Sequence, residues 1–240
     1  MIRVLVWNEY IHEKDPNNAS STVYPHGIHN AIAGFLGKEE DIEVMTATLD
    51  DENCGITDEV LKNTDVIIWW GHCGHDRVPD GVAEKVHEAV LNGMGAVFLH
   101  SAHKSKPFMR LMGTSCSLIW RESGDTERVW VSKPSHPIAA GIDTCFELEA
   151  DETYGEPFGI PNPDDTVFMG WYSGGEVFRS GVTFTRDNGR IFYFQPGHET
   201  FPTFYDPNVQ RVILNAVRWA KPDVRTENVM DCPNPPSRNK

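Results

Sequence analysis

The chain has 240 residues, of which 40% are hydrophobic and 23% are charged, as in ordinary globular proteins and unlike disordered chains. Its formal net charge of -14 argues against nucleic acid or an anionic membrane as a partner, because both require a basic face. No stretch reaches the roughly 18 apolar residues of a membrane span, and the N-terminus lacks a signal-peptide pattern. With five scattered cysteines and no C-x-x-C pair, we expect a cytoplasmic protein with reduced thiols.

The first half of the chain alternates strand-like and helix-like patterns. Apolar runs predict strands at 2–7, 42–48, 65–70 and 96–99. Apolar residues at helical spacing, with helix start and stop signals, predict helices at 25–37, 57–62, 80–92 and 106–112, and a polar loop at 14–22. This alternation with short links predicts an α/β fold with a parallel sheet and right-handed crossovers.

The second half has few helical patterns before residue 207. We predict short strands at 128–132, 166–171, 176–186 and 190–195. Asp187-Asn188-Gly189 is a hairpin-turn signal between the last two of them, so this part is expected to be an antiparallel extension. A final helix begins at Pro207 with Asp206 as its N-cap. We expect one domain over 1–221 and an extended tail over 222–240.

Histidines and acids follow several predicted strands. Because the carboxyl ends of parallel strands meet at one edge of the sheet, these residues are expected to line a single crevice. The candidates are Glu9, the loop from His72 to His75, the turn from His100 to His103, the acidic segment at Glu152, and His198-Glu199.

His100 is the leading catalytic candidate. It follows a buried strand and precedes the small residues Ser101 and Ala102, which is typical of a tight strand-to-helix turn that lifts a side chain into the crevice. An imidazole there suits acid–base work, although a polar residue that only satisfies the backbone is the alternative. Ser101 is a weaker nucleophile candidate, because G-x-S-x-G is absent.

Two further histidine patterns indicate a metal. His72 and His75 lie three residues apart in a glycine-bearing loop, and His100 and His103 repeat that spacing. We predict His72, His75 and His100 as ligands of a divalent ion, with zinc the best match to nitrogen and oxygen donors. Chance pairing in a histidine-rich chain is the alternative, since H-E-x-x-H is absent.

Other chemistry is less well supported by the sequence. Cys73 lies between two histidines, which could lower its pKa and make it a nucleophile. His198 could be a base oriented by Glu199, and Tyr154 could stack on a sugar face. No phosphate-binding glycine loop is present, so no nucleotide cofactor is expected.

At these same residues the sequence resembles the trehalose-utilisation (ThuA-like) family. The resemblance lies in Phe98-Leu99-His100-Ser101-Ala102, Ser135-His136-Pro137-Ile138 with Gly141, Asp151-Glu152-Thr153-Tyr154, Val182 to Arg186, and Gly189 to Phe194 through Gly197-His198. It implies a three-layer, flavodoxin-like fold of the class I glutamine amidotransferase type. In amidotransferases the strand-four turn carries a cysteine, where this chain has His100 or Ser101. The later His-Pro-Glu run corresponds to Gln195-Pro196-Gly197, so glutaminase activity is not expected.

The resemblance and the residues together predict an enzyme that acts on a disaccharide or a 3-keto sugar by acid–base or metal-assisted chemistry. The predicted catalytic residues are His100, Ser101, Glu152 and His198, and the predicted substrate-binding residues are Glu9, His103, Tyr154 and Glu199. The alternative is a non-catalytic sugar-binding or regulatory protein on the same fold. A homo-oligomer with two-fold symmetry is the default expectation.

Overall fold

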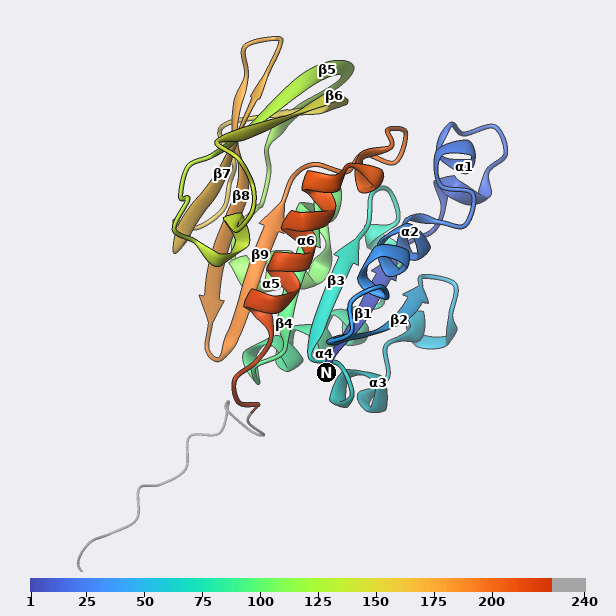
Figure 1. Ribbon diagram of the computed structural model, residues 1–240. Coiled ribbons are helices and arrows are strands. Elements are labelled where there is room, and N and C mark those ends of the chain that lie inside the picture. Colours follow the sequence, from blue (N-terminus) through green and yellow to red (C-terminus); the bar gives the residue numbers. More distant parts are fainter. Residues whose placement is uncertain (226–240) are drawn as a thin grey trace, which may run out of the picture.

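A nine-stranded sheet runs through the centre of the computed structural model, which describes residues 1–225 (Figure 1). The strand order is β2-β1-β3-β4-β9-β8-β7-β5-β6. Its first five strands are parallel: β1 (Ile2–Asn8), β2 (Ile42–Thr48), β3 (Val66–Trp70), β4 (Gly95–Leu99) and β9 (Gly189–Phe194). The order 2-1-3-4 followed by a fifth parallel strand is that of the flavodoxin-like folds, as expected.

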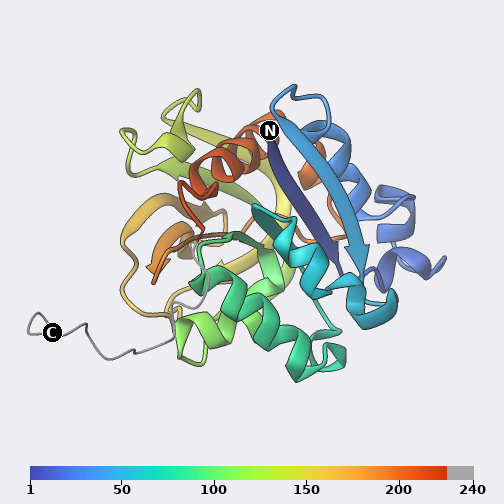
Figure 2. The ribbon, with the colours of Figure 1, turned by 90° about the horizontal axis from the view of Figure 1, so that it is seen from below.

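Helices cover both faces of the parallel part, which explains why β3 and β4 are apolar and buried along their whole length (Figure 2). On one face lie α2 (Ile28–Leu36) and α6 (Pro207–Ala220), and on the other lie α3 (Asp58–Lys62), α4 (Asp80–Leu91) and α5 (Lys106–Met112). Asp206 caps α6 as predicted, by accepting from the backbone N–H groups of Asn208 and Val209. Among residues 1–225, no helix is long and apolar enough to cross a membrane.

The antiparallel part consists of β5 (Ile119–Val131), β6 (Cys145–Gly155), β7 (Asp165–Tyr172) and β8 (Val177–Arg186). It joins the parallel part where β8 pairs antiparallel with β9, through the predicted turn at Asp187–Gly189. In Figure 1 these strands form the upper left of the molecule, beside the carboxyl ends of the parallel strands. The antiparallel extension is therefore confirmed.

Three local expectations were wrong. The strand predicted at 128–132 begins nine residues earlier, because the polar segment from Ile119 pairs with β6. β6 itself was not predicted as a strand, since its acidic residues hide the alternation. The predicted loop 14–22 contains the start of a short helix, α1 (Ser20–Val23). Most of the predicted tail, from residue 226, lies outside the described residues.

Candidate active site

The turn after β4 has a strained backbone. His100 has φ 52°, in the left-handed region that non-glycine residues seldom adopt, and it begins a 3-10 turn over His100–Lys104. Such a conformation costs about 1–3 kcal/mol and persists only where surrounding contacts enforce it. The predicted tight turn is confirmed, and His100 rather than Ser101 occupies its strained position.

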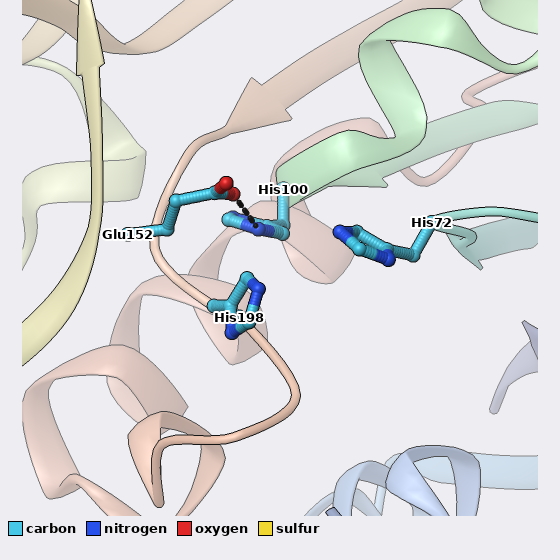
Figure 3. A group of neighbouring side chains, drawn as sticks. All are labelled: His72, His100, Glu152 and His198. Atoms are coloured by element: carbon cyan, nitrogen blue, oxygen red, sulfur yellow. Dashed lines mark ion pairs between the residues drawn. The ribbon is translucent and has the colours of Figure 1, made fainter. Parts of the chain in front are cut away.

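Four side chains from four separate segments converge beside this turn (Figure 3). His72 follows β3, His100 follows β4, His198 follows β9, and Glu152 comes from β6 of the antiparallel part. One nitrogen or oxygen atom from each lies within 4.8 Å of the others. The structure thus brings together three of the predicted strand-end histidines and the predicted acid.

The contact between His100 and Glu152 requires a proton or a metal ion. His100 Nδ1 lies 2.9 Å from the backbone oxygen of Gln195, so its N–H donates to that carbonyl. A neutral ring then has no proton on Nε2, yet Nε2 lies 3.0 Å from Glu152 Oε2. A proton, carried by Nε2 or by the Glu152 carboxyl group, or a metal ion therefore accounts for this contact.

The charges of this pair shift their pKa values in opposite directions. Burial lowers the pKa of His100, but the hydrogen bond and charge of Glu152 outweigh it and leave that pKa raised. Burial raises the pKa of Glu152, but the bond to His100 and the charge of its ring leave it lowered. Both shifts favour the form of the pair in which His100 is an imidazolium and Glu152 is a carboxylate. Gln195 holds both partners, because its amide also donates to the backbone oxygen of Glu152.

The other two imidazoles of the cluster belong to His198 and His72. Burial and the nearby charge of His100 lower the pKa of His198 to about 4, so this ring is neutral at pH 7. Its Nδ1 lies 2.8 Å from Thr200 Oγ1 and accepts from the Thr200 backbone N–H at 3.3 Å, and these contacts orient the ring. His72 Nδ1 is buried and lies 3.5 Å from Glu199 Oε1, without a hydrogen bond within residues 1–225.

Glu9 anchors the loop that carries His72. Its carboxylate accepts from the backbone N–H groups of His72, Cys73 and Gly74, at 2.7, 2.9 and 2.9 Å. The side chain is almost fully buried and both of its oxygens are engaged. The structure therefore shows that Glu9 positions this loop, and its predicted contact with substrate stays a prediction.

Asp151 performs the same task for the loop that carries His198. It is fully buried and accepts from the backbone N–H groups of Gly197 and His198, at 2.9 and 3.1 Å, and from Thr203 Oγ1. The sequence drew attention to Glu152 and gave this neighbour little weight. An acid pair at a strand end was the only available signal, and it does not distinguish a positioning residue from a reacting one.

One more predicted residue, Tyr154, contacts the cluster directly. The ring of Tyr154 stacks on His100 with centroids 5.0 Å apart, and its hydroxyl lies 3.0 Å from Ser101 Oγ. His103 points elsewhere, because its Nδ1 donates to the backbone oxygen of Cys116. Burial lowers the pKa of His103 to about 3, so it is a neutral wall residue.

The H-x-x-H spacing contributes one residue from each pair. His75 stands outside the four-residue group, and burial lowers its pKa. Glu152 and His198 belong to the group together with His72 and His100, whereas His75 does not. The predicted ligand set of His72, His75 and His100 is thus rearranged by the structure.

Further titratable side chains, His12, Cys73 and Glu199, surround the cluster. His12, which the sequence did not single out, lies 2.6 Å from Glu199 through its Nδ1. Although burial raises the pKa of Glu199, this bond and the charges of His72 and His198 lower it to about 2. Burial and Glu9 raise the pKa of Cys73 to about 12, which argues against the thiolate nucleophile considered above.

A pocket of about 390 Å³ opens onto the cluster. Its volume falls within the range of small-molecule sites. The predicted residues on its wall are His72, His75, Ser101, His103, Glu152, Tyr154 and His198. The residues that the sequence missed are Lys104, Ser117, Leu118, Trp120 and Glu122. Most of the missed residues belong to β5 or the segment before it, where no strand was predicted.

Solved structures share this fold. A ThuA-like protein from Parabacteroides merdae has a TM-score of 0.64 and 17% identity, with 94% of this chain and 92% of that chain covered. A cytoplasmic protein from Salmonella typhimurium has a TM-score of 0.62 and 15% identity, with 92% and 100% covered. A β-galactosidase from Rahnella sp. R3 has a TM-score of 0.59 and 10% identity, with 92% of this chain but 32% of the enzyme covered.

No curated protein matches the sequence. The family model described as ThuA, trehalose utilisation, matches residues 3–220. That range contains the nine strands except for the first residue of β1, together with the strained turn at His100 and the four converging side chains. The chain therefore belongs to the ThuA trehalose-utilisation family.

Proposed function

We propose that this protein is an enzyme that binds a divalent cation, zinc by preference, at His72, His100 and His198, with Glu152 beside the ion, and acts there on a disaccharide or a 3-keto sugar. The observation that carries the proposal is the convergence of four side chains, with donor atoms within 4.8 Å of one another, beside one pocket: His72, Glu152 and His198 line it, and His100 is buried behind them. The family's link to trehalose utilisation supports a sugar as the substrate.

The donor set favours zinc. Catalytic zinc sites use three protein ligands, histidine most often, and leave one position open. The Nδ1–H of His100 donates a hydrogen bond to the backbone oxygen of Gln195, which leaves Nε2 as the nitrogen that can bind the ion. Histidine ligands of metals usually make such a hydrogen bond through their other ring nitrogen. A cation would also compensate the charge of the Glu152 carboxylate, which lies 3.0 Å from His100 Nε2.

A 3-keto sugar suits such a site because the C–H bond beside its carbonyl is acidic. A bound cation would polarise that carbonyl as a Lewis acid. Three imidazoles are enough to hold the ion, which leaves the Glu152 carboxylate as the base that accepts the proton. Tyr154 and Ser101, hydrogen-bonded to each other on the pocket wall, would orient a sugar hydroxyl.

A second candidate is acid–base catalysis without a metal. The raised pKa of His100 and the lowered pKa of Glu152 favour it, since together they give a ready proton donor and acceptor. Both candidates share the pocket and the substrate class. They differ in whether a proton or a metal ion lies between His100 Nε2 and Glu152.

Metal analysis of protein purified without chelators or added ions separates the two. We expect about one zinc per chain in the wild type and in His75→Ala, and almost none in His100→Ala. His75→Ala is the matched control, because His75 lines the same pocket but lies outside the cluster. Turnover of keto-sugar by a metal-free wild type would favour the second candidate. Zinc that survives in His100→Ala would contradict the proposed ligand set.

Assembly and location are also proposals. We propose a two-fold homo-oligomer, the commonest arrangement among soluble oligomers. A cytoplasmic location is supported by two Salmonella typhimurium proteins of this fold that are named as cytoplasmic.

A further inference from the structure

A large apolar side chain stands exposed at the rim of the pocket. Trp120 of β5 is 65% exposed, although it lines the same cavity as buried Glu152 and Tyr154. Exposed tryptophans occur elsewhere on this sheet, but Trp120 differs from them because it lines the pocket beside the reactive cluster, where its ring is open to contact with a ligand.

The register of β5 and β6 places Trp120 over the site. Trp120 pairs directly with Tyr154 in this antiparallel ladder, so both side chains project from the same face of the sheet. Tyr154 stacks on His100 at the inner end of the pocket. Leu118 and Glu122, two residues to either side of Trp120, line the pocket as well, as the period of a strand requires. The outer wall is thus a row of Leu118, Trp120 and Glu122.

Polar groups around this row suit a neutral polyol. Lys104 reaches the wall and donates to the backbone oxygen of Ser115 and to Ser117 Oγ. Glu122 offers acceptors, so hydroxyl groups would find both donors and acceptors. Among the lining residues, Lys104 is the single lysine or arginine, against the two carboxylates of Glu122 and Glu152. In the outer wall the charges of Lys104 and Glu122 cancel, so this end of the pocket offers a phosphate group no surplus of positive charge.

We infer that Leu118, Trp120 and Glu122 form an outer subsite for the second ring of a neutral, unphosphorylated disaccharide. Trp120 stacks on the apolar C–H face of that ring, while the ring to be processed lies at the His100–Glu152 end. Trp120 is then a specificity-determining residue. This inference rests on the proposed sugar substrate, and it holds with or without a bound metal.

Isothermal titration with trehalose, glucose and trehalose 6-phosphate tests the inference on the full chain. The variants are Trp120→Ala, Trp120→Phe and, as a matched control, Trp171→Ala. Trp171 is a comparably exposed tryptophan of the same sheet that lies away from the pocket. Equal zinc content in all variants shows that the cluster is intact.

The wild type is expected to bind trehalose at least about tenfold more tightly than glucose or trehalose 6-phosphate. Trp120→Ala should lower the affinity for trehalose by about tenfold or more, because the variant no longer buries an aromatic ring against the sugar. Its affinity for glucose should not change. Trp120→Phe should stay within about threefold of the wild type, and Trp171→Ala should match it.

Several outcomes would overturn the inference. Equal trehalose affinity in Trp120→Ala and wild type would remove Trp120 from recognition, and equal losses in Trp120→Ala and Trp171→Ala would make the effect non-specific. Tighter binding of the phosphorylated sugar would contradict the neutral subsite. Absence of sugar binding in a zinc-loaded wild type would overturn the subsite while leaving the proposed metal cluster standing.

Discussion

The parallel and antiparallel parts of the sheet make different contributions to the site. The parallel part supplies His72, His100 and His198, each directly after a buried strand. The antiparallel part supplies the acid, Glu152, and the pocket wall with Trp120. Neither part contains a complete cluster. We infer that the common scaffold provides the nitrogen donors, while the added strands provide the acid and the selection of substrate.

Substitution of one residue from each part tests this division most strongly. His100→Ala and Glu152→Gln should each lower kcat/KM for a 3-keto derivative of trehalose by at least about 100-fold, because both parts are needed for proton transfer. Steady-state kinetics measures the effect, with Trp171→Ala as a variant that should retain activity. Full activity in Glu152→Gln would show that the antiparallel part contributes structure alone.

Each part also has a carboxylate that anchors a histidine loop. Glu9→Gln and Asp151→Asn would point an amide N–H₂ at backbone N–H groups that now donate to an oxygen. We expect each substitution to lower the free energy of unfolding by about 2–3 kcal/mol. Urea denaturation measures the loss, and exposed Glu43→Gln, on β2, is the control and should change it by less than about 0.5 kcal/mol. Equal stabilities for all three would mean that the loops hold without these acids.

Packing in the parallel part is tight enough to exclude one methyl group. A Cβ at Gly95 of β4 would overlap the backbone carbonyl of Ala220 at the end of α6. Gly95→Ala should therefore destabilise the protein by about 1–3 kcal/mol in thermal or urea unfolding. Gly34→Ala is the matched control, since nothing lies within 4 Å of a Cβ there, and alanine in α2 should stabilise by about 0.5–1 kcal/mol. Destabilisation by both would argue against the close approach of α6.

In the antiparallel part a buried acid should produce a pH dependence. Burial raises the pKa of Glu127 well above its usual value, so the native state keeps a proton that the unfolded chain releases above about pH 4.5. The unfolding free energy should thus fall with rising pH, by up to about 1.4 kcal/mol per pH unit until the native pKa is reached. Glu127→Gln should remove this component, so its advantage over wild type should grow between pH 5 and 8. A constant difference would mean that Glu127 is ionised in the folded protein.

The sequence predicts the parallel part better than the antiparallel part, for a physical reason. Strands that are buried on both faces are continuous apolar runs, and β3 and β4 were predicted to within one residue of their observed bounds. In β5 and β6 one face is exposed to solvent, and acids such as Asp125 and Glu149 interrupt the alternation of apolar and polar residues. Register is set there by cross-strand pairing, which a single sequence does not reveal.

The difference between the two parts of the sheet also explains which site residues could be predicted from the sequence. His72, His100 and His198 could be predicted because the edge of a parallel sheet gathers strand ends. Trp120 could not, since its place depends on pairing with Tyr154. The spacing of His72 and His75 indicated a shared ion, but the fold brings Glu152 and His198 to the cluster from distant segments.

The most direct test of the account is an anomalous-difference map at the zinc absorption edge, from crystals of the full chain grown with zinc. The account predicts one strong peak about 2.0–2.2 Å from His72, His100 and His198 nitrogens, with Glu152 as a fourth ligand or a close neighbour. A peak beside His12 and Cys73 instead, or no peak at the four-residue cluster, would contradict it.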